Sequence, residues 1–336
     1  MNGINTSMIH VTKRDGTVQT FDLDKIHKVL EWATQDITNV SQSEIELRSN
    51  IQLYDKSRGL GGRLATGRAN DGKFDHGIQY IKLDTVADLP EIKSLIRNNI
   101  LKETKISNLF VGNDGMTSIA KFLAKNLNIS KEFKLIHIDS DLNSMVMNFE
   151  NGQRIHTNSI VLSSPVKQSI EILEKSNINI DSLKLADINQ LEYFPAIIIM
   201  VESEVSIDLE NEFIQEYATG NFSSITDNFK KSISKKENFY TLVCSHDFSN
   251  ENFENDYESI NSRLKNELDL IFNRKYKILS NHKWRYSTPK NFYTLDSSIN
   301  IGLDRFVGMC GDIFTNGKFD GAIRSGISVA SKLLAK

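Results

Sequence analysis

The most constraining feature of this chain is an acidic residue that ends a strand-like run and is followed by glycines and arginines. The run is residues 51–54, the acid is Asp55, and the segment after it is residues 56–63 (KSRGLGGR). In a Rossmann-type βαβ fold such an acid ends the second strand and accepts hydrogen bonds from ribose hydroxyls. The G-x-G-x-x-G turn expected about 20 residues earlier is not in this sequence. The chain therefore carries the later part of a dinucleotide-binding pattern without its opening turn.

The composition indicates a water-soluble globular protein. Of the 336 residues, 39% are hydrophobic and 25% are charged, so the chain can bury a substantial core. The longest purely apolar run, residues 196–201, is too short to span a bilayer, and the polar N-terminus lacks the apolar stretch of a secretory signal. We therefore expect a cytoplasmic protein with no membrane partner.

Charge and cysteine content narrow the range of partners. The 40 basic residues are balanced by 43 acidic ones without a basic stripe, so nucleic acid is not an expected partner. The two cysteines, Cys244 and Cys310, cannot form a disulfide framework and are expected to be buried thiols. No metal site is predicted, because the histidines lack metal-ligand spacing; His137, His246 and His282 are interpreted as ordinary polar residues. A small-molecule substrate is the expected partner, and the oligomeric state stays open.

The N-terminal segment predicts a β-hairpin followed by two helices. Two β-prone runs, residues 8–12 and 17–21, flank residues 13–16 (KRDG), whose Asp-Gly pair supplies the positive φ of a tight turn. Apolar residues then recur at helical spacing, at Leu23, Ile26, Val29, Leu30 and Ala33. A capping box formed by Ser41 and Glu44 predicts the start of a second helix.

The strings VTKRDG and FDLDKI in this segment resemble the ATP-cone, the regulatory domain at the N-terminus of class I ribonucleotide reductase large subunits. The resemblance continues to about Leu53 and implies that ATP or dATP is bound. Phosphate contacts are implied for Lys13, Arg14 and Lys25, and cations beside turn amides suit that role. The alternative is a solvated hairpin tip. The further helices that help close the nucleotide pocket in that family are not recognisable after Leu53.

A series of motifs follows residue 51 in a fixed order. They are residues 55–63 (DKSRGLGGR), 74–80 (FDHGIQY), 111–116 (VGNDGM), 159–165 (SIVLSSP), 284–289 (WRYSTP) and 310–322 (CGDIFTNGKFDGA). Together they resemble the renalase-like branch of the flavin-containing amine oxidase superfamily, over the chain from about Ile51 to the C-terminus. The resemblance implies FAD as cofactor, with contacts from Asp55, Arg58, Gly61, Gly62, Arg63, Gly311, Asp312, Asp320, Gly321 and Ala322.

These residue types suit a flavin dinucleotide. Glycines let the backbone approach a pyrophosphate, and arginines neutralise it. Gly321 and Ala322 open a predicted helix whose N-terminus would stabilise negative charge on the pyrophosphate and the reduced ring. The buried face of that helix is expected to carry Ile323, Ile327, Ala330 and Leu334. Taken alone, Gly311-Asp312 is also typical of a simple turn.

Residues 165–281 predict an inserted, mainly antiparallel substrate domain. Strand-like runs occur at residues 193–206 and 239–245, and a helix at 256–272 has an apolar face made by Tyr257, Ile260, Leu264, Leu268 and Ile271. Its aromatic residues and Met200 are expected in the core. The predicted fold class is α/β with α+β elements. It comprises a partial ATP-cone (residues 1–53), an incomplete Rossmann-like FAD-binding domain (54–164 and 282–336) and the substrate domain (165–281).

The resemblance implies an oxidoreductase that transfers a hydride from a dihydronicotinamide or an amine to the flavin, which O₂ reoxidises. The candidate substrate-side residues are His76, Gln79, Tyr80, Trp284 and Arg285. Arg285 suits an anionic substrate group, and Trp284 or Tyr286 suits a substrate ring. The alternative for residues 284–286 is an amphipathic strand with its aromatic side chains packed inward.

The missing glycine turn weighs against cofactor binding. Its hydrogen bonds to a pyrophosphate contribute about 1.5–3 kcal/mol each. Losing two of them would weaken binding by more than about a hundredfold. Three interpretations therefore stay open: an FAD-dependent oxidoreductase, an ATP/dATP-binding regulatory-type protein that uses the cone, and a non-functional fusion of two truncated domains.

Overall fold

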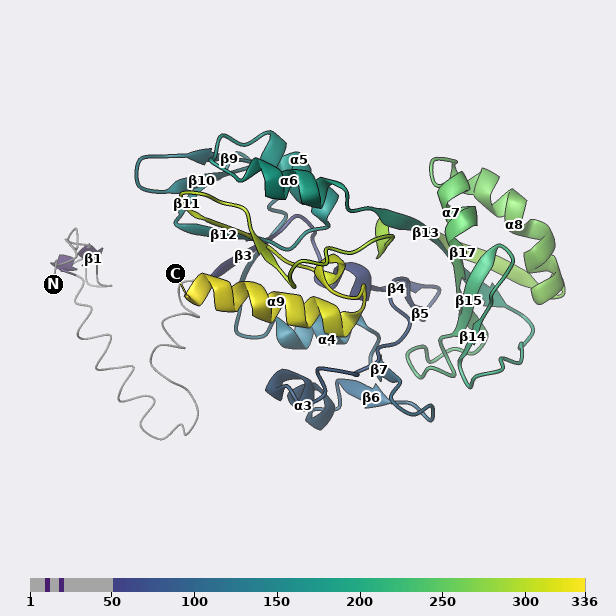
Figure 1. Ribbon diagram of the computed structural model, residues 1–336. Helices are drawn as coiled ribbons and strands as arrows, with labels where there is room; N and C mark the ends of the chain where they lie inside the picture. Colours follow the sequence, from purple (N-terminus) through teal and green to yellow (C-terminus); the bar gives the residue numbers. More distant parts are fainter. Residues whose placement is uncertain (1–9, 13–17, 21–50, 336) are drawn as a thin grey trace. The chain divides into compact units, whose positions relative to one another are not determined.

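The computed structural model describes residues 10–12, 18–20 and 51–335 (Figure 1). The chain divides into two compact units. One is Met1–Leu53 with Asn126–Ser130, and the other is Tyr54–Lys125 with Lys131–Lys336. Lys13, Arg14 and Lys25 lie outside the described residues, and so do both helices predicted before residue 51.

In the first unit, the predicted N-terminal hairpin is confirmed. Strand β1 (His10–Thr12) pairs antiparallel with β2 (Val18–Thr20), with His10 opposite Thr20 and Thr12 opposite Val18. The two β-prone runs therefore pair as the sequence predicted.

The second unit is built around two three-stranded sheets. One has the order β12 (Ser159–Leu162), β19 (Phe306–Met309), β18 (Ile299–Asn300), and the other is the meander β9 (Leu135–Ser140), β10 (Met145–Phe149), β11 (Arg154–Thr157). In the sequence, β12 is followed by α5 (Val166–Glu174) and α6 (Ser182–Asn189). One apolar core joins the two helices and both sheets. Pairing of β12 with β19 is parallel and in register from Ser159–Phe306 to Leu162–Met309. A parallel pair formed across the insertion is what the incomplete Rossmann-like pattern predicted.

The strand that ends in Asp55 does not join this parallel sheet. Strand β3 (Gln52–Asp55) pairs with β8 (Asn128–Lys131) instead, and no described strand lies on the free edge of β12. In the doubly wound order 3-2-1-4, strand 1 separates the acid-ending strand from strand 4. The split sheet therefore agrees with a sequence that lacks the strand and glycine turn before Asp55.

The following helices and strands complete the second unit. They are η1 (Gly62–Leu64), β4 (Thr66–Ala69), β5 (Gly72–Asp75), α3 (Pro90–Arg97), β6 (Leu101–Glu103), β7 (Phe110–Gly112), α4 (Thr117–Leu123), η2 (Asp312–Phe314) and α9 (Phe319–Leu334). The predicted helix after Gly115 is confirmed as α4, with Met116 and Ile119 fully buried.

The buried face predicted for α9 is wrong in part. Ile323 packs against a core cluster, but Ile327 is 47% and Leu334 62% exposed, and Ala330 is exposed as well. The helix buries Ser325 and Val329 instead. Helical periodicity showed correctly that these apolar residues share one face, but among the described residues it is the Ile323 end of that face that packs against a core cluster.

The inserted region forms the predicted antiparallel domain. Its sheet has the order β14 (Ile214–Glu216), β15 (Phe222–Asp227), β16 (Phe239–Cys244), β13 (Tyr193–Ser203), β17 (Tyr276–Pro289). Helices α7 (His246–Asn252) and α8 (Tyr257–Ile271) pack on one face of it (Figure 1). The long strand β17 runs without a break across the predicted domain boundary at residues 281/282.

The core of this domain follows the predicted patterns. In α8 the residues Ile260, Leu264 and Leu268 are fully buried, while Tyr257 is 46% exposed at the first turn. Met200 packs with Phe74 and Phe239, as a core residue should. Both cysteines are free and buried, as expected, and burial raises the pKa of Cys310 to about 11.

Candidate functional site

Two predicted cofactor residues, Arg63 and Asp312, meet in the structure. Arg63 lies in η1, and Asp312 begins η2 directly after β19. The guanidinium donates from Nη2 to Asp312 Oδ1 at 2.6 Å and from Nη1 to Asp312 Oδ2 at 2.8 Å. It also donates to the carbonyl oxygen of Ser287 at 2.6 Å. The fold thus brings the first and last flavin-type motifs of the sequence into one place.

The glycines beside this pair leave room. Gly62 has φ +51° and Gly311 has φ +149°, in the region that favours glycine, and a Cβ built at either position would meet nothing within 4 Å. Gly61 has φ +129°. Open space beside backbone glycines is what close approach of a phosphate or a ribityl chain requires.

Asp55 and Arg58 are at the end of β3 and just beyond it. Asp55 Oδ1 accepts a hydrogen bond from the Ser57 amide at 2.8 Å, which fixes the turn that follows the strand. Its Oδ2 has no hydrogen-bond partner among the described residues, so this oxygen can accept from a ribose hydroxyl. Arg58 is exposed.

Asp320, Gly321 and Ala322 form the first turn of α9 and hold the loop before it. Asp320 is 1% exposed and accepts from Thr85 Oγ1 at 2.8 Å and Asn316 Nδ2 at 3.2 Å. Burial alone would raise the pKa of Asp320, but these hydrogen bonds bring it below its ordinary value. A Cβ on Gly321 would lie 2.1 Å from Asn316 Oδ1, so a larger residue there would displace the Asn316 side chain. In this structure these residues position the helix.

Two of the predicted substrate-side residues, His76 and Trp284, lie together with a third that the sequence analysis missed. The rings of His76 and Trp284 are stacked at 6.0 Å, and His282 contacts both, at 4.7 and 4.4 Å. Trp284 Nε1 donates to the His76 carbonyl oxygen at 2.6 Å. The available signal for His282 was its spacing of two residues from Trp284 on one strand. We call His76, His282 and Trp284 the ring cluster.

Both histidines of the ring cluster are held neutral. Burial lowers the pKa of His76, against the raising effects of a backbone hydrogen bond and of Asp75. Burial, with a further contribution from His76, lowers the pKa of His282 to about 4. A neutral imidazole can donate from one nitrogen and accept at the other. His76 Nδ1 is buried and has no hydrogen-bond partner in the described part of the chain.

The other predicted substrate-side residues have their hydrogen-bond and ion-pair partners outside the ring cluster. Gln79 is buried and donates to the carbonyl oxygens of Asp75 and Gly77, and Tyr80 donates to Glu216 Oε1 at 2.7 Å. Arg285 follows Trp284 in β17, where the pairing with β13 shifts register between Phe194 and Ala196. It pairs with Glu254 at 2.8 Å.

A buried ion pair that the sequence did not reveal lies next to His76. Lys231 Nζ is 2.7 Å from Asp75 Oδ2, and both side chains are 0% exposed. Asp75 Oδ1 also accepts from the Met116 amide at 2.9 Å and from Thr66 Oγ1 at 2.5 Å. The ion pair connects Asp75, the last residue of β5, to the loop after β15. Burial lowers the pKa of Lys231, against the raising effect of Asp75.

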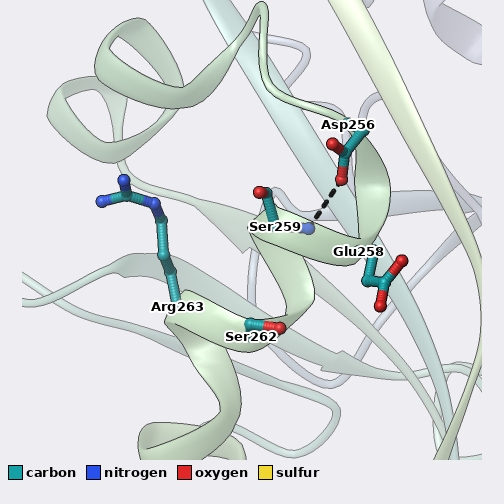
Figure 2. Close-up of a pocket in the computed structure, with 5 residues that line it drawn as sticks. All are labelled: Asp256, Glu258, Ser259, Ser262 and Arg263. Atoms are coloured by element: carbon teal, nitrogen blue, oxygen red, sulfur yellow. Dashed lines mark hydrogen bonds between the residues drawn. The ribbon is translucent and has the colours of Figure 1, made fainter.

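Two of the surface pockets in the described part of the chain differ in size and lining. The larger, about 530 Å³, is lined by the first turns of α8 alone (Figure 2). There Asp256 Oδ1 accepts from the Ser259 amide at 2.7 Å, a helix N-cap. The smaller, about 380 Å³, lies between α5, β13, α7 and β17 and includes Arg285 and Tyr286. Among the described residues no group of acidic, histidine and cysteine side chains could hold a metal ion. No described helix has the length and apolar character needed to cross a membrane.

Comparison with known structures identifies the fold of the second unit. A protein of Pyrococcus furiosus superimposes with a TM-score of 0.53 at 10% identity, over 86% of this chain and 93% of that one. Putrescine oxidase bound to putrescine superimposes with a TM-score of 0.51 at 13% identity, over 68% of this chain and 54% of the enzyme. An oxidoreductase from Methanosarcina mazei gives 0.50 at 11% identity, over 73% and 59%. The α/β fold expected from the sequence is therefore confirmed, while the amine oxidase superfamily and its renalase-like branch stay predictions.

Residues 9–58 match the ATP cone domain, which confirms the second resemblance. They are similar to ribonucleoside-diphosphate reductase 1 subunit alpha of Salmonella typhimurium, with 56% identity over 52 residues, 16% of this chain. The Escherichia coli subunit is 60% identical over 45 residues, 13% of this chain. The aligned parts are only 7% and 6% of those subunits. The match to the ATP cone domain includes Asp55, which is also the acidic residue of the dinucleotide-binding pattern. One residue at the end of β3 therefore belongs to both patterns.

Proposed function

We propose that the second unit is an FAD-dependent oxidoreductase of renalase-like or amine oxidase type. The observation that carries this proposal is the Arg63–Asp312 pair, which unites two cofactor motifs 249 residues apart. The fold of the unit, which it shares with putrescine oxidase, supports the same class.

The residues present fit a flavin dinucleotide on the ribose and ribityl side. Asp55 Oδ2 would hold ribose hydroxyls, Asp312 the ribityl chain, and Arg63 the pyrophosphate, with Gly62 and Gly311 leaving the space. The glycine turn that would hold the pyrophosphate from the other side is not in the sequence, so we expect weak binding. When bound, the flavin supplies a hydride acceptor that O₂ reoxidises.

The ring cluster is the proposed substrate face. Its stacked aromatic rings exclude water and offer a flat apolar wall to a dihydronicotinamide or an amine. The hydrogen bond from Trp284 to the His76 backbone keeps these rings in place.

Titration of the purified chain with FAD, followed by quenching of flavin fluorescence, tests the proposal. We expect saturable binding, at least tenfold weaker in Arg63→Gln and Asp312→Asn. Arg68→Gln, an exposed arginine on β4, is the matched control and should bind like the wild type. Anaerobic addition of a dihydronicotinamide or an amine should then bleach the flavin absorbance. Absence of saturable FAD binding would overturn the proposal.

A second proposed function, nucleotide binding by residues 9–58, is favoured by their match to the ATP cone domain. Calorimetric titration with ATP and dATP should give a Kd that Lys13→Gln raises and Lys28→Gln leaves unchanged. A chain that binds neither FAD nor ATP would support the third interpretation, a fusion in which neither site is complete.

A further inference from the structure

The smaller pocket combines cations with aromatic walls. It has a volume of about 380 Å³, within the range of small-molecule sites. Its polar lining includes Lys167 from α5, Arg285 from β17 and Lys290 just after β17. We call it the β17 pocket.

Three cations converge on the β17 pocket against two carboxylates. Arg285 pairs with Glu254 at 2.8 Å, and Lys290 with Glu192 at 3.3 Å. Lys167 donates to the Asn189 carbonyl oxygen at 2.7 Å and forms no ion pair within the described ranges. One positive charge is therefore left over for a ligand.

Both ion pairs at the pocket are open to exchange. The side chains of Arg285 and Glu254 are 56% and 78% exposed, and Glu192 is 59% exposed. Exposed pairs of this kind contribute about 0–1 kcal/mol, so an anion with better geometry can replace the carboxylates. The Arg285 guanidinium is already held 4.6 Å from the centre of the Phe253 ring. This contact orients the guanidinium, whose N–H groups can donate to two phosphate oxygens at once.

The aromatic walls of the pocket favour a ring-bearing ligand over a bare ion. Tyr193 and Tyr286 lie edge to face at 5.6 Å, and both line the pocket with Phe253. The Tyr193 hydroxyl is fixed by a hydrogen bond from the Val166 amide at 3.1 Å, and burial raises its pKa to about 12. The phenol is neutral at pH 7, so it adds no negative charge to the pocket.

We propose that the β17 pocket binds the phosphate of a mononucleotide, with Arg285, Lys290 and Lys167 on the phosphate and the tyrosines against the base. A cationic amine is disfavoured there by the same charges. The inference goes beyond the proposed function, because it concerns a pocket that the ring cluster does not line and needs no flavin.

Calorimetric titration of the full chain with uridine monophosphate, without flavin, tests the inference. A pyrimidine nucleotide is used because residues 9–58 match a domain named for ATP. We expect saturable binding that weakens at least tenfold in the double variant Arg285→Gln/Lys290→Gln. Lys134→Gln, which changes an exposed lysine just before β9, is the control and should leave the affinity unchanged. Uridine and inorganic phosphate should each bind at least tenfold more weakly than the nucleotide.

Glu254→Gln provides a variant whose effect misfolding cannot imitate. Removing the competing carboxylate frees Arg285, so nucleotide binding should tighten several-fold. The inference is overturned by no saturable binding, by equal affinity in the double variant, by inorganic phosphate binding as tightly as the nucleotide, or by a Glu254→Gln variant that binds no more tightly. Since FAD is not used, these outcomes are independent of flavin binding.

Discussion

Arg63 donates two hydrogen bonds, of 2.6 and 2.8 Å, to the carboxylate of Asp312, which is 249 residues further along the chain. The Asp312 side chain is only 6% exposed, and that of Arg63 is 30% exposed. With its further bond to Ser287, one guanidinium joins the segment after β3, the end of β17 and the segment after β19. This single contact therefore supports both the stability of the second unit and the proposed cofactor site.

Arg63→Gln should destabilise the protein strongly. The variant leaves the Asp312 carboxylate buried without its cation, which typically costs about 3–5 kcal/mol, and we expect the lower end because Arg63 is partly exposed. Urea denaturation measures the change in the free energy of unfolding. Arg68→Gln should change it by less than about 0.5 kcal/mol. Equal losses in the two variants would show that the pair is not a structural contact.

Lys231→Met should destabilise the protein by about 3–5 kcal/mol, because it leaves Asp75 charged and unpaired in the core. In the double variant Asp75→Asn/Lys231→Met the buried charge is removed as well, so much of that loss should be recovered. A double-mutant cycle by urea denaturation measures the coupling. Additive effects of the two substitutions would contradict a buried ion pair.

The free energy of unfolding should fall as the pH is lowered from about 6.5 to 4, in part because of His282. Its pKa of about 4 in the folded protein is below its ordinary value of 6.5, so in this window the unfolded chain binds the proton first. Since the ring is partly exposed and screened, we expect a contribution on the order of 1 kcal/mol.

Urea denaturation at pH 7, 6, 5 and 4 measures this effect. His282→Gln should show a shallower fall than the wild type. An unchanged profile in His282→Gln would contradict a depressed pKa.

Gly77→Ala should distort the site. A Cβ at this position would lie 1.9 Å from the Arg63 carbonyl oxygen, so the backbone must move. We expect a loss of about 1–3 kcal/mol in the free energy of unfolding and a change in the fluorescence of Trp284, which bonds to the adjacent His76 carbonyl. Gly59→Ala is the matched control, since its Cβ meets nothing within 4 Å. Identical behaviour of the two variants would contradict the close approach.

Local elements of the fold were predictable from local patterns. The helix predicted at residues 256–272 is α8 (Tyr257–Ile271), and the strand predicted at 239–245 is β16 (Phe239–Cys244). Apolar periodicity and an Asp N-cap define such elements without reference to the rest of the chain. The same patterns could not predict which face of α9 is covered, because periodicity identifies an apolar face and not its neighbour.

The candidate site divides in the same way. Motif residues such as Arg63 and Asp312 could be named in advance because glycines, arginines and acids recur in a recognisable order. His282 and Lys231 could not, because their partners His76 and Asp75 lie far away in the sequence and no spacing rule connects them.

By itself the sequence determined the elements, the inserted antiparallel domain and the two ancestral patterns that meet at Asp55. Only the tertiary structure decided that Arg63 pairs with Asp312, that Trp284 bonds to His76 while Arg285 pairs with Glu254, and that β3 and β12 belong to separate sheets. The physical reason is that secondary structure follows from short-range backbone and side-chain preferences. A site is made by contacts between distant segments, which packing, burial and charge select only when the whole chain has folded.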